Sequence, residues 1–174
     1  CYQWGRKDPF LGWKSAVATN SWPAAVESKP KTGTIAYATA NPMTLIAQGS
    51  NYDWLYTGGA TSIEATRWKG SGSPKTIYDP CPYGWRVPDG GSKGVWSKSL
   101  GSSSYFEHPY ISNKGGSNFS GKFGSATTIW YPAAGSRYSN DGSLGTVGNY
   151  CGYYWSASPS GSDAFYLSFV YGGG

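Results

Sequence analysis

Side chains that could carry acid–base or nucleophilic catalysis are few and scattered in this chain. His108 is the single histidine, and it stands before Pro109 in a polar stretch, which is typical of a surface loop. The nine carboxylates are dispersed and include no closely spaced pair suited to glycosidase chemistry, although a hydrolase that pairs distant carboxylates stays open as a minor alternative. No Gly-x-Ser-x-Gly elbow and no Walker loop occurs. The sequence therefore predicts a protein that is not an enzyme and uses no cofactor.

The three cysteines, Cys1, Cys81 and Cys151, are the other residues with reactive side chains. Because their number is odd, at most one internal disulfide can form. No Cys-x-x-Cys pair is present, so the pattern indicates neither a zinc site nor a redox dithiol. We therefore expect no metal site.

The charge and hydropathy patterns exclude two classes of partner. The net charge is +5, but the basic residues are scattered and form no stripe for nucleic acid. No apolar run approaches the roughly 18 residues that a membrane-spanning helix needs. Glycine, tyrosine and tryptophan are abundant (26, 15 and 9 residues), while only 13% of the residues are charged. This composition favours a single loop-rich α+β or β domain with an aromatic core.

Residues 131–174 have a composition of their own. Glycine, serine, tyrosine and asparagine fill 26 of these 44 positions, and the only charged residues are Arg137, Asp141 and Asp163. Antibody paratopes have the same bias, because tyrosine gives broad contact at low entropic cost while serine, glycine and asparagine adapt their hydrogen bonds. A loop-heavy β domain would also be rich in these residues, so composition alone leaves both interpretations open.

Residues 79–88 read DPCPYGWRVP, and almost every position is constrained. The three prolines fix φ and remove backbone donors, which excludes both a helix and a central strand. Gly84 allows a positive φ. Because the segment suits a scaffold element, we expect Trp85 to be buried as an apolar anchor. We expect Arg86 to donate to backbone carbonyls or to a carboxylate.

The elements that position these motifs are expected to be short, because helix formers are scarce. The apolar patterns and turn residues predict short helices at residues 63–69 and within 41–55, a turn at 70–74, a strand at 127–131, and irregular structure with short strands over 1–30. No internal repeat and no linker divides the chain, so we expect one domain over residues 1–174.

A further strand is expected at residues 164–171, where apolar and other side chains alternate. The alternation predicts that Leu167 and Phe169 face the core. It also sends Phe165 inward unless a β-bulge turns this side chain outward.

The chain resembles one family over nearly its whole length. Residues 79–88 resemble the family's Cys-Pro-x-Gly-Trp-Arg-Val-Pro signature. Further family-like blocks follow in the family's order: YQWGRKDPF (2–10), NPMTLI (41–46), DWL (53–55), GVWSK (94–98), YPAAG (131–135), DG (141–142), YWSAS (154–158) and AFYLSF (164–169). The family is abundant in surface proteins and fimbriae of gut Bacteroidetes.

This family is similar to the C-type-lectin-like fold shared by formylglycine-generating enzymes and retroelement-diversified adhesins. The resemblance implies a loop-rich α+β domain with short antiparallel strands and few short helices. The chain departs from the family at both ends, because no signal peptide or stalk precedes it and it stops where the family continues into one more strand. We therefore expect a domain that is truncated at one or both ends.

The chemistry of other proteins with this fold does not transfer to the chain. Formylglycine-generating enzymes use a cysteine pair in the C-terminal half, where this sequence has Cys151 alone. Lectins that bind sugar through calcium use Glu-Pro-Asn and Trp-Asn-Asp motifs, and neither occurs.

The resemblance instead implies a variable ligand face, because retroelement-diversified proteins carry their variable residues in this half. Mutation of template adenines turns asparagine codons into codons for tyrosine, serine, aspartate, cysteine and similar residues. The candidate ligand-binding residues of these kinds are Tyr138, Ser139, Asn149, Tyr150, Cys151, Tyr153, Ser162, Asp163, Phe165 and Ser168. Cys151 is then a sampled surface variant, so we predict no disulfide between it and Cys81. Tyr154 and Trp155 belong to a family-like block and are expected to be packed.

These observations lead to one function and one alternative. We expect an extracellular adhesin domain, on a cell surface or at a pilus tip, whose residues 136–171 bind a protein or glycan ligand on another cell, a host surface or a phage. The alternative is a structural fimbrial subunit that is completed by a strand from a neighbouring pilus subunit, because an exposed sheet edge is a template for strand addition. Both place the protein outside the cell, with no nucleic-acid partner and no membrane span.

Overall fold

The computed structural model describes residues 1–10, 25–48, 53–58, 66–100, 110–111, 115–120, 128–145 and 151–170. Within these ranges the chain is loop-rich, with short strands and two six-residue helices. The elements in chain order are β1 (Val26–Glu27), α1 (Ile35–Ala40), β2 (Ile46–Ala47), α2 (Val95–Leu100), β3 (Tyr110–Ile111), β4 (Gly116–Ser120), β5 (Thr128–Pro132), β6 (Cys151–Ser160) and β7 (Asp163–Val170). Neither helix is long and apolar enough to cross a membrane, as judged over the described residues.

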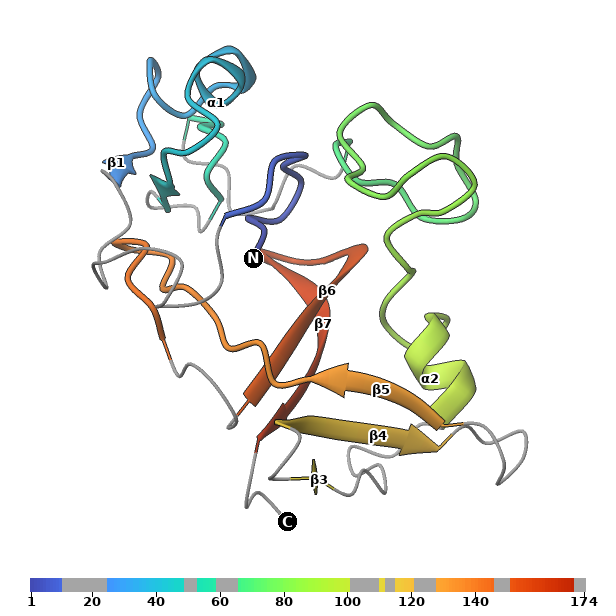
Figure 1. The fold of residues 1–174 in the computed structure, drawn as a ribbon. Coiled ribbons are helices and arrows are strands. Elements are labelled where there is room, and N and C mark those ends of the chain that lie inside the picture. The colour runs from blue at the N-terminus through green and yellow to red at the C-terminus, as the bar shows by residue number, and fades with distance from the viewer. Residues whose placement is uncertain are drawn as a thin grey trace.

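The strands form three small sheets. β1 and β2 pair in parallel, β3, β4 and β5 form an antiparallel sheet in that order, and β6 and β7 form an antiparallel hairpin. Figure 1 shows the hairpin in the middle of the molecule, between the β4–β5 sheet and the segments around α1. The strands expected at 127–131 and 164–171 are confirmed as β5 and β7 over the residues that the structure describes.

Helix α1 begins at a capping residue and ends before a proline. The Thr34 hydroxyl accepts the Tyr37 N–H (3.0 Å) and satisfies a free donor of the first turn. Pro42 follows the C-terminal cap Asn41, where the helix cannot continue. The buried guanidinium of Arg6 donates to carbonyl oxygens at this end, including that of Pro42 (3.2 Å). These contacts join the N-terminal segment to α1.

The helix expected within residues 41–55 is not found in the described part of that stretch. Residues 41–45 turn after α1, and Ile46 then enters β2 and is fully buried. The sequence-based prediction placed the helix too late, because Pro42 ends a helix rather than starting one here.

The helix expected at residues 63–69 is also wrong for the part that can be described, which starts at residue 66 and forms a turn. Arg67 and Trp68 are adjacent and both buried. Arg67 pairs with the carboxylate of Asp53 (2.7 Å), whereas the Trp68 indole donates to the carbonyl of Tyr78 (2.9 Å). Consecutive side chains that both enter the interior do not suit one apolar helix face. The turn expected at 70–74 is present at residues 71–73.

A large bulge interrupts the β6–β7 hairpin. Trp155 pairs with Tyr166 and Pro159 pairs with Ala164, so three residues of β6 lie opposite the single residue Phe165. Leu167 and Phe169 are buried, as their alternation predicts, but the bulge shifts the pattern so that Ala164 is buried and Phe165 is 41% exposed.

The bulge is where the hairpin docks on the rest of the protein. Within it, the Ala157 N–H donates to the Pro88 carbonyl (2.8 Å), and the Ser158 hydroxyl accepts the Gly90 N–H (3.0 Å). Gly90 lies so close that an added Cβ would stand 2.2 Å from the Ser156 hydroxyl, so only glycine fits.

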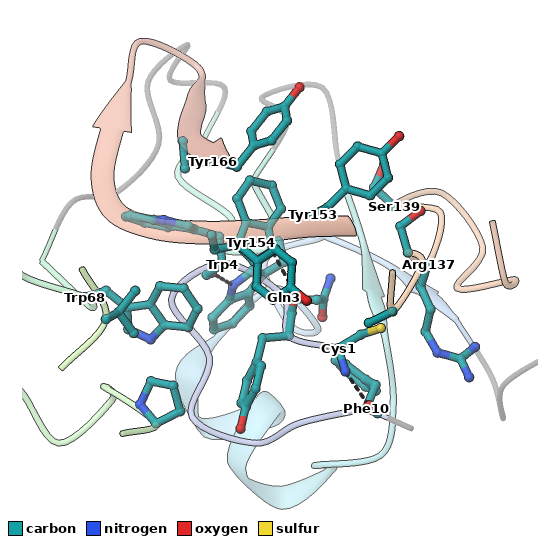
Figure 2. A pocket seen from close by; sticks show the side chains of 18 of the residues that line it. Cys1, Gln3, Trp4, Phe10, Trp68, Arg137, Ser139, Tyr153, Tyr154 and Tyr166 are labelled. Atoms are coloured by element: carbon teal, nitrogen blue, oxygen red, sulfur yellow. Dashed lines mark hydrogen bonds between the residues drawn. The ribbon is translucent and has the colours of Figure 1, made fainter. Parts of the chain in front are cut away.

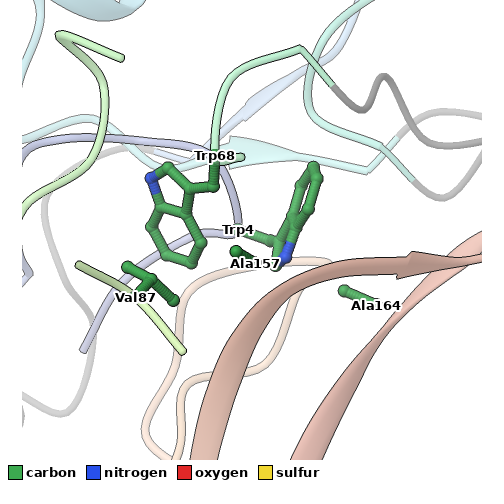
Figure 3. Packing of buried hydrophobic residues seen from close by; sticks show 5 residues of the cluster. All are labelled: Trp4, Trp68, Val87, Ala157 and Ala164. Carbon is green, nitrogen blue, oxygen red and sulfur yellow. The ribbon is translucent and has the colours of Figure 1, made fainter. Parts of the chain in front are cut away.

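The core between the hairpin and the N-terminal half is built around two indoles. Trp4 and Trp68 pack 5.8 Å apart with Val87, Ala157 and Ala164 (Figure 3). The Trp4 indole also donates to the carbonyl of Ser156 in the bulge (2.7 Å), so its only polar atom is satisfied. This cluster joins the first residues of the chain to the last strands.

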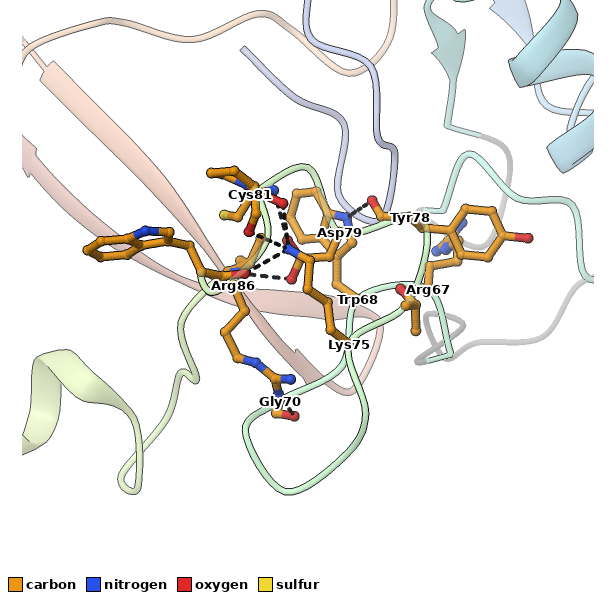
Figure 4. Close-up of polar contacts among 12 residues, drawn as sticks. Arg67, Trp68, Gly70, Lys75, Tyr78, Asp79, Cys81 and Arg86 are labelled. Atoms are coloured by element: carbon orange, nitrogen blue, oxygen red, sulfur yellow. Dashed lines mark hydrogen bonds and ion pairs between the residues drawn. The ribbon is translucent and has the colours of Figure 1, made fainter.

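Residues 79–88 form a loop held by polar contacts, as Figure 4 shows. The buried Asp79 carboxylate accepts from the Lys75 ammonium (2.8 Å) and from the backbone N–H groups of Cys81 (2.9 Å) and Val87 (3.1 Å). Lys75 also donates to the carbonyl of Trp85 (2.7 Å). One buried carboxylate and one lysine thus close the loop.

The two expectations for the side chains of this loop have opposite outcomes. Arg86 donates to the carbonyls of Gly70 (2.6 Å) and Ser73 (3.0 Å), which confirms its predicted use. Trp85 is 73% exposed, so its predicted burial is wrong. The loop is closed through the backbone of Trp85, and Val87 is the residue that enters the core instead.

Candidate ligand-binding site

The hairpin presents one aromatic face to solvent beyond the bulge. Tyr153 and Trp155 alternate on β6, and their partners across the hairpin are Ser168 and Tyr166 on β7. All four side chains are exposed. Because side chains of a strand alternate between faces, the four residues share the face opposite the buried Leu167.

The exposed rings contact one another. Trp155 and Tyr166 meet edge to face, with centroids 5.7 Å apart and planes at 78°, and Tyr153 lies 6.1 Å from Tyr166. The Trp155 indole donates to the carbonyl of Tyr2 (3.0 Å), which fixes its orientation. Trp155 was expected to be packed, but it is 39% exposed because this outward position of the hairpin is only partly covered by the N-terminal segment.

Tyr154, on the opposite face of β6, is packed as expected. Its ring lies edge to face against Tyr131 (4.9 Å) and stacks on Phe169 (6.3 Å), and its hydroxyl donates to the carbonyl of Pro132. Burial, with a smaller contribution from Tyr131, raises the pKa of Tyr154 to about 12. This hydroxyl therefore stays neutral and structural.

A loop before β6 adds Tyr138 and Ser139 beside this face, and both are exposed. The Tyr138 N–H donates to the carbonyl of Ser143 (2.9 Å), and its carbonyl accepts the N–H of Gly142 (3.0 Å), which has a φ of 73°. The Arg137 guanidinium donates to the carbonyl of Gly142 (2.6 Å). The loop is thus closed by its own backbone, which leaves the tyrosine side chain outside.

A pocket of about 990 Å³ lies between this loop, the hairpin and the N-terminal segment. Figure 2 shows Tyr153, Tyr154 and Tyr166 from the hairpin, Arg137 and Ser139 from the loop, and Cys1, Gln3 and Trp4 from the N-terminal segment. The pocket is within the size range of ligand sites, about 300–1,000 Å³. Aromatic side chains supply much of its lining, from buried Trp4 and Trp68 to the exposed Tyr138.

The charged side chains among the described lining residues are Asp53, Arg137 and Asp163. Asp53 is buried and paired with Arg67 (2.7 Å). Arg137 faces a backbone carbonyl, and burial lowers its pKa. Burial also raises the pKa of Tyr153, with a further contribution from Cys151. Of these three charged side chains, Asp163 is the one that is exposed, whereas Asp53 is paired and Arg137 is half-buried.

The predicted site residues other than Cys151 fall into three groups. Those that line the pocket are Tyr138, Ser139, Tyr153, Ser162 and Asp163. Ser168 is exposed opposite Tyr153 on the hairpin face, and Phe165 is exposed but packs against Gly91. Asn149 and Tyr150 lie outside the described residues.

The prediction that Cys151 is a ligand-binding surface residue is wrong, because its side chain is only 1% exposed. It begins β6 on the same side as Tyr153, but residues of the preceding loop cover it, with the Gly135 N–H donating to its carbonyl (2.9 Å). No disulfide joins Cys1, Cys81 and Cys151 in the structure.

Sequence reasoning missed three members of the site, Tyr2, Trp155 and Tyr166, which all line the pocket. For Tyr166 a signal existed, because it alternates with Ser168 on the face opposite Leu167. Tyr2 lies at the site because the N-terminal segment runs past the hairpin, and no local sequence pattern predicts that position.

Among the described residues, no group of three histidine, cysteine or acidic side chains could hold a metal ion. No family model, curated protein or solved structure matches the chain.

Proposed function

We propose that this chain is a non-enzymatic ligand-binding domain of an extracellular adhesin, with a C-type-lectin-like fold and a binding face in residues 136–171. The observation that carries the proposal is the separation of the hairpin into two faces. Tyr153 and Tyr166 stand exposed at a pocket, while Leu167 and Phe169 on the opposite face are buried in the core. Exposed aromatic side chains that the core does not need are typical of binding surfaces.

The secondary-structure content and the exposed positions of the hairpin support a C-type-lectin-like fold and a ligand-binding function. A loop-rich chain with short strands and two short helices is what a C-type-lectin-like domain would require. The side chains at positions 138, 139, 153 and 168 are exposed, as residues varied by retroelement diversification would need to be. We accordingly place the protein on a cell surface or at a pilus tip, which agrees with its resemblance to fimbrial and surface proteins.

Two of the nine carboxylates are buried in ion pairs, which leaves fewer candidates for the hydrolase alternative. Asp53 and Asp79 are buried, and their oxygens accept from Arg67 and Lys75 at 2.7 and 2.8 Å. Carboxylates used in this way stabilise the fold and are not available as a general acid and base.

A second candidate is the structural fimbrial subunit, and one observation favours it. Within the described residues, β7 pairs with β6 alone, so its other edge has no strand beside it. A strand from a neighbouring chain would satisfy that edge by β-strand addition. In this case the tyrosines of the hairpin would serve assembly rather than ligand capture.

The test separates binding from stability. The domain is displayed as a labelled streptavidin tetramer, and its binding to a panel of bacterial and epithelial cells is measured for the wild type and for a Tyr138→Ala, Tyr153→Ala double variant. We expect the variant to lose binding and keep its melting temperature. The control is Ile129→Ala, which changes an exposed residue of β5 that lies outside residues 136–171 and does not line the pocket.

Two results would count against the proposal. If the wild type binds none of the cells, or if the double variant binds as the wild type does, the adhesin proposal is wrong. If the double variant loses its melting transition as well, the tyrosines belong to the core, and the structural-subunit candidate takes its place.

A further inference from the structure

The hairpin face has the chemistry of a platform for a neutral ligand. Tyr153, Trp155 and Tyr166 each keep about two fifths to one half of their surface exposed, and their mutual contacts fix the rings in place. Preformed aromatic surfaces bind with little loss of side-chain entropy. A ligand for this platform must present a flat apolar surface to the rings.

Hydroxyls are the most numerous side-chain polar groups at the pocket. The hydroxyl-bearing residues that line it include Tyr138, Tyr153, Tyr166, Ser136, Ser139 and Ser162. Such groups both donate and accept, so they can match a ligand edge that carries hydroxyls of its own. Gln48 adds an amide with the same dual capacity.

The charges argue against an ionic ligand. An anionic ligand would find no open cationic side chain among the described lining residues, because Arg137 is half-buried and donates to the Gly142 carbonyl. The exposed carboxylate of the lining, Asp163, lies by the turn of the hairpin, on the other side of the bulge from Trp155 and Tyr166, so the aromatic platform itself carries no negative charge for a cation. What remains is a neutral ligand with apolar C–H faces and hydroxyl edges.

We infer that the pocket binds a neutral oligosaccharide, whose sugar rings stack by their C–H faces on Trp155 and Tyr166 while the tyrosine and serine hydroxyls bind the sugar hydroxyls. The inference rests on the proposed binding function and names its ligand. A pocket of about 990 Å³ suits a short chain of sugar rings better than a flat protein surface, which needs about 800 Å² of contact on each partner. No metal ion takes part in this mode.

The first experiment uses an array of neutral oligosaccharides together with sialylated and sulfated forms of the same chains, probed with the labelled tetramer in the presence of a chelator. We expect binding to neutral members. Tyr166→Ala and Trp155→Ala should weaken it about tenfold or more, as for residues at the centre of an interface. Tyr166→Phe keeps the ring and should stay within about threefold of the wild type, and Ile129→Ala, outside the face and the pocket, should match the wild type.

Trp155→Ala also removes the hydrogen bond to Tyr2 and could unfold the protein. In that case the comparison of Tyr166→Ala with Tyr166→Phe tests the inference. Binding confined to the acidic oligosaccharides, loss of binding with the chelator, competition by choline but not by neutral sugars, or equal effects of Tyr166→Ala and Tyr166→Phe would each overturn the inference. Absence of any binding on the array would overturn it as well.

A second experiment separates this inference from the proposed function. Cells that the wild-type tetramer binds are treated with periodate, which destroys sugar rings, or with protease. Binding lost with periodate supports the inference. Binding that survives periodate but is lost with protease, and is still lost in the Tyr138→Ala, Tyr153→Ala variant, leaves an adhesin whose ligand is a protein and refutes the glycan. If the face variants bind the cells as the wild type does, both the glycan inference and the proposed adhesin function are wrong.

Discussion

The signature loop (residues 79–88) and the β6–β7 hairpin both expose aromatic side chains, but different forces hold them in place. The loop is closed by a buried carboxylate, a lysine and backbone carbonyls, and neither Tyr83 nor Trp85 contributes a buried ring. The hairpin is held by apolar packing of Leu167 and Phe169 on one face. The rings are therefore exposed for two different reasons. In the loop, polar contacts hold the backbone and no ring needs to be buried; in the hairpin, the exposed rings lie on the face opposite the packed one.

This difference predicts where truncation of an aromatic ring matters. In the hairpin, inward and outward rings alternate, so neighbouring substitutions should have opposite effects on stability. In the loop, removal of a polar group should matter more than removal of the large apolar ring.

The largest effect is expected within the hairpin. Phe169→Ala should lower the free energy of unfolding by about 3–5 kcal/mol, as truncation of a buried aromatic does. Tyr153→Ala, on the opposite face, should change it by less than about 0.5 kcal/mol. Urea denaturation of both variants measures the difference. Similar costs for the two would mean that the hairpin does not have one buried and one open face.

The next effect concerns the loop. Asp79→Asn removes the charge that pairs with Lys75 and leaves that ammonium without its carboxylate. We expect a loss of about 3 kcal/mol in the free energy of unfolding, because a partner of a partly buried charge is removed. Chemical denaturation measures it, and Asp141→Asn, at an exposed turn, is the control. If both variants unfold alike, the loop is not held by this ion pair.

A pH dependence should follow from the same carboxylate. Burial alone would raise the pKa of Asp79, but Lys75 and the N–H groups of Cys81 and Val87 outweigh it, and the net pKa is lowered. A lowered pKa contributes stability that is present above the ordinary value of about 3.9 and is lost as the pH falls through the folded-state value. The melting temperature of the wild type should therefore fall more steeply below about pH 4 than that of Asp79→Asn. Parallel curves would contradict this assignment.

The smallest effect is expected for the largest exposed ring of the loop. Trp85→Ala should change the free energy of unfolding by less than about 0.5 kcal/mol, because the ring is 73% exposed and the lysine bond to this residue uses its carbonyl. Thermal melts of Trp85→Ala beside Asp79→Asn provide the comparison. A large loss in Trp85→Ala would show that the loop needs its apolar side chain after all.

Sequence patterns predicted the parts of the fold that depend on local alternation. Leu167 and Phe169 face the core because a strand with one buried face repeats every second residue. The bulge that exposes Phe165 has no such signal, because it depends on contacts of Ala157 and Ser158 with residues about seventy positions earlier. Trp85 was misplaced for a related reason, since whether a loop is closed by its side chains or by its backbone cannot be inferred from their types.

The candidate site was predicted in part for the same reasons. Tyr138 and Tyr153 are exposed beside Gly/Ser-rich segments, as their context suggested. Cys151 was misplaced because the segment around Gly135 pairs with the start of β6, and Tyr2 was missed because its place in the pocket depends on the path of the whole chain. Composition indicated which half of the chain was exposed and aromatic, but it carried no information on which segments meet there.

The alternating hairpin also makes this protein a natural starting point for combinatorial engineering. Positions 153, 155, 166 and 168 form a contiguous patch on a rigid two-stranded support, and none of the four side chains is part of the buried core. A library randomised at these positions, with the inward residues kept, should yield many members that fold. Selection from it could recover binders to new targets without loops that must first become ordered.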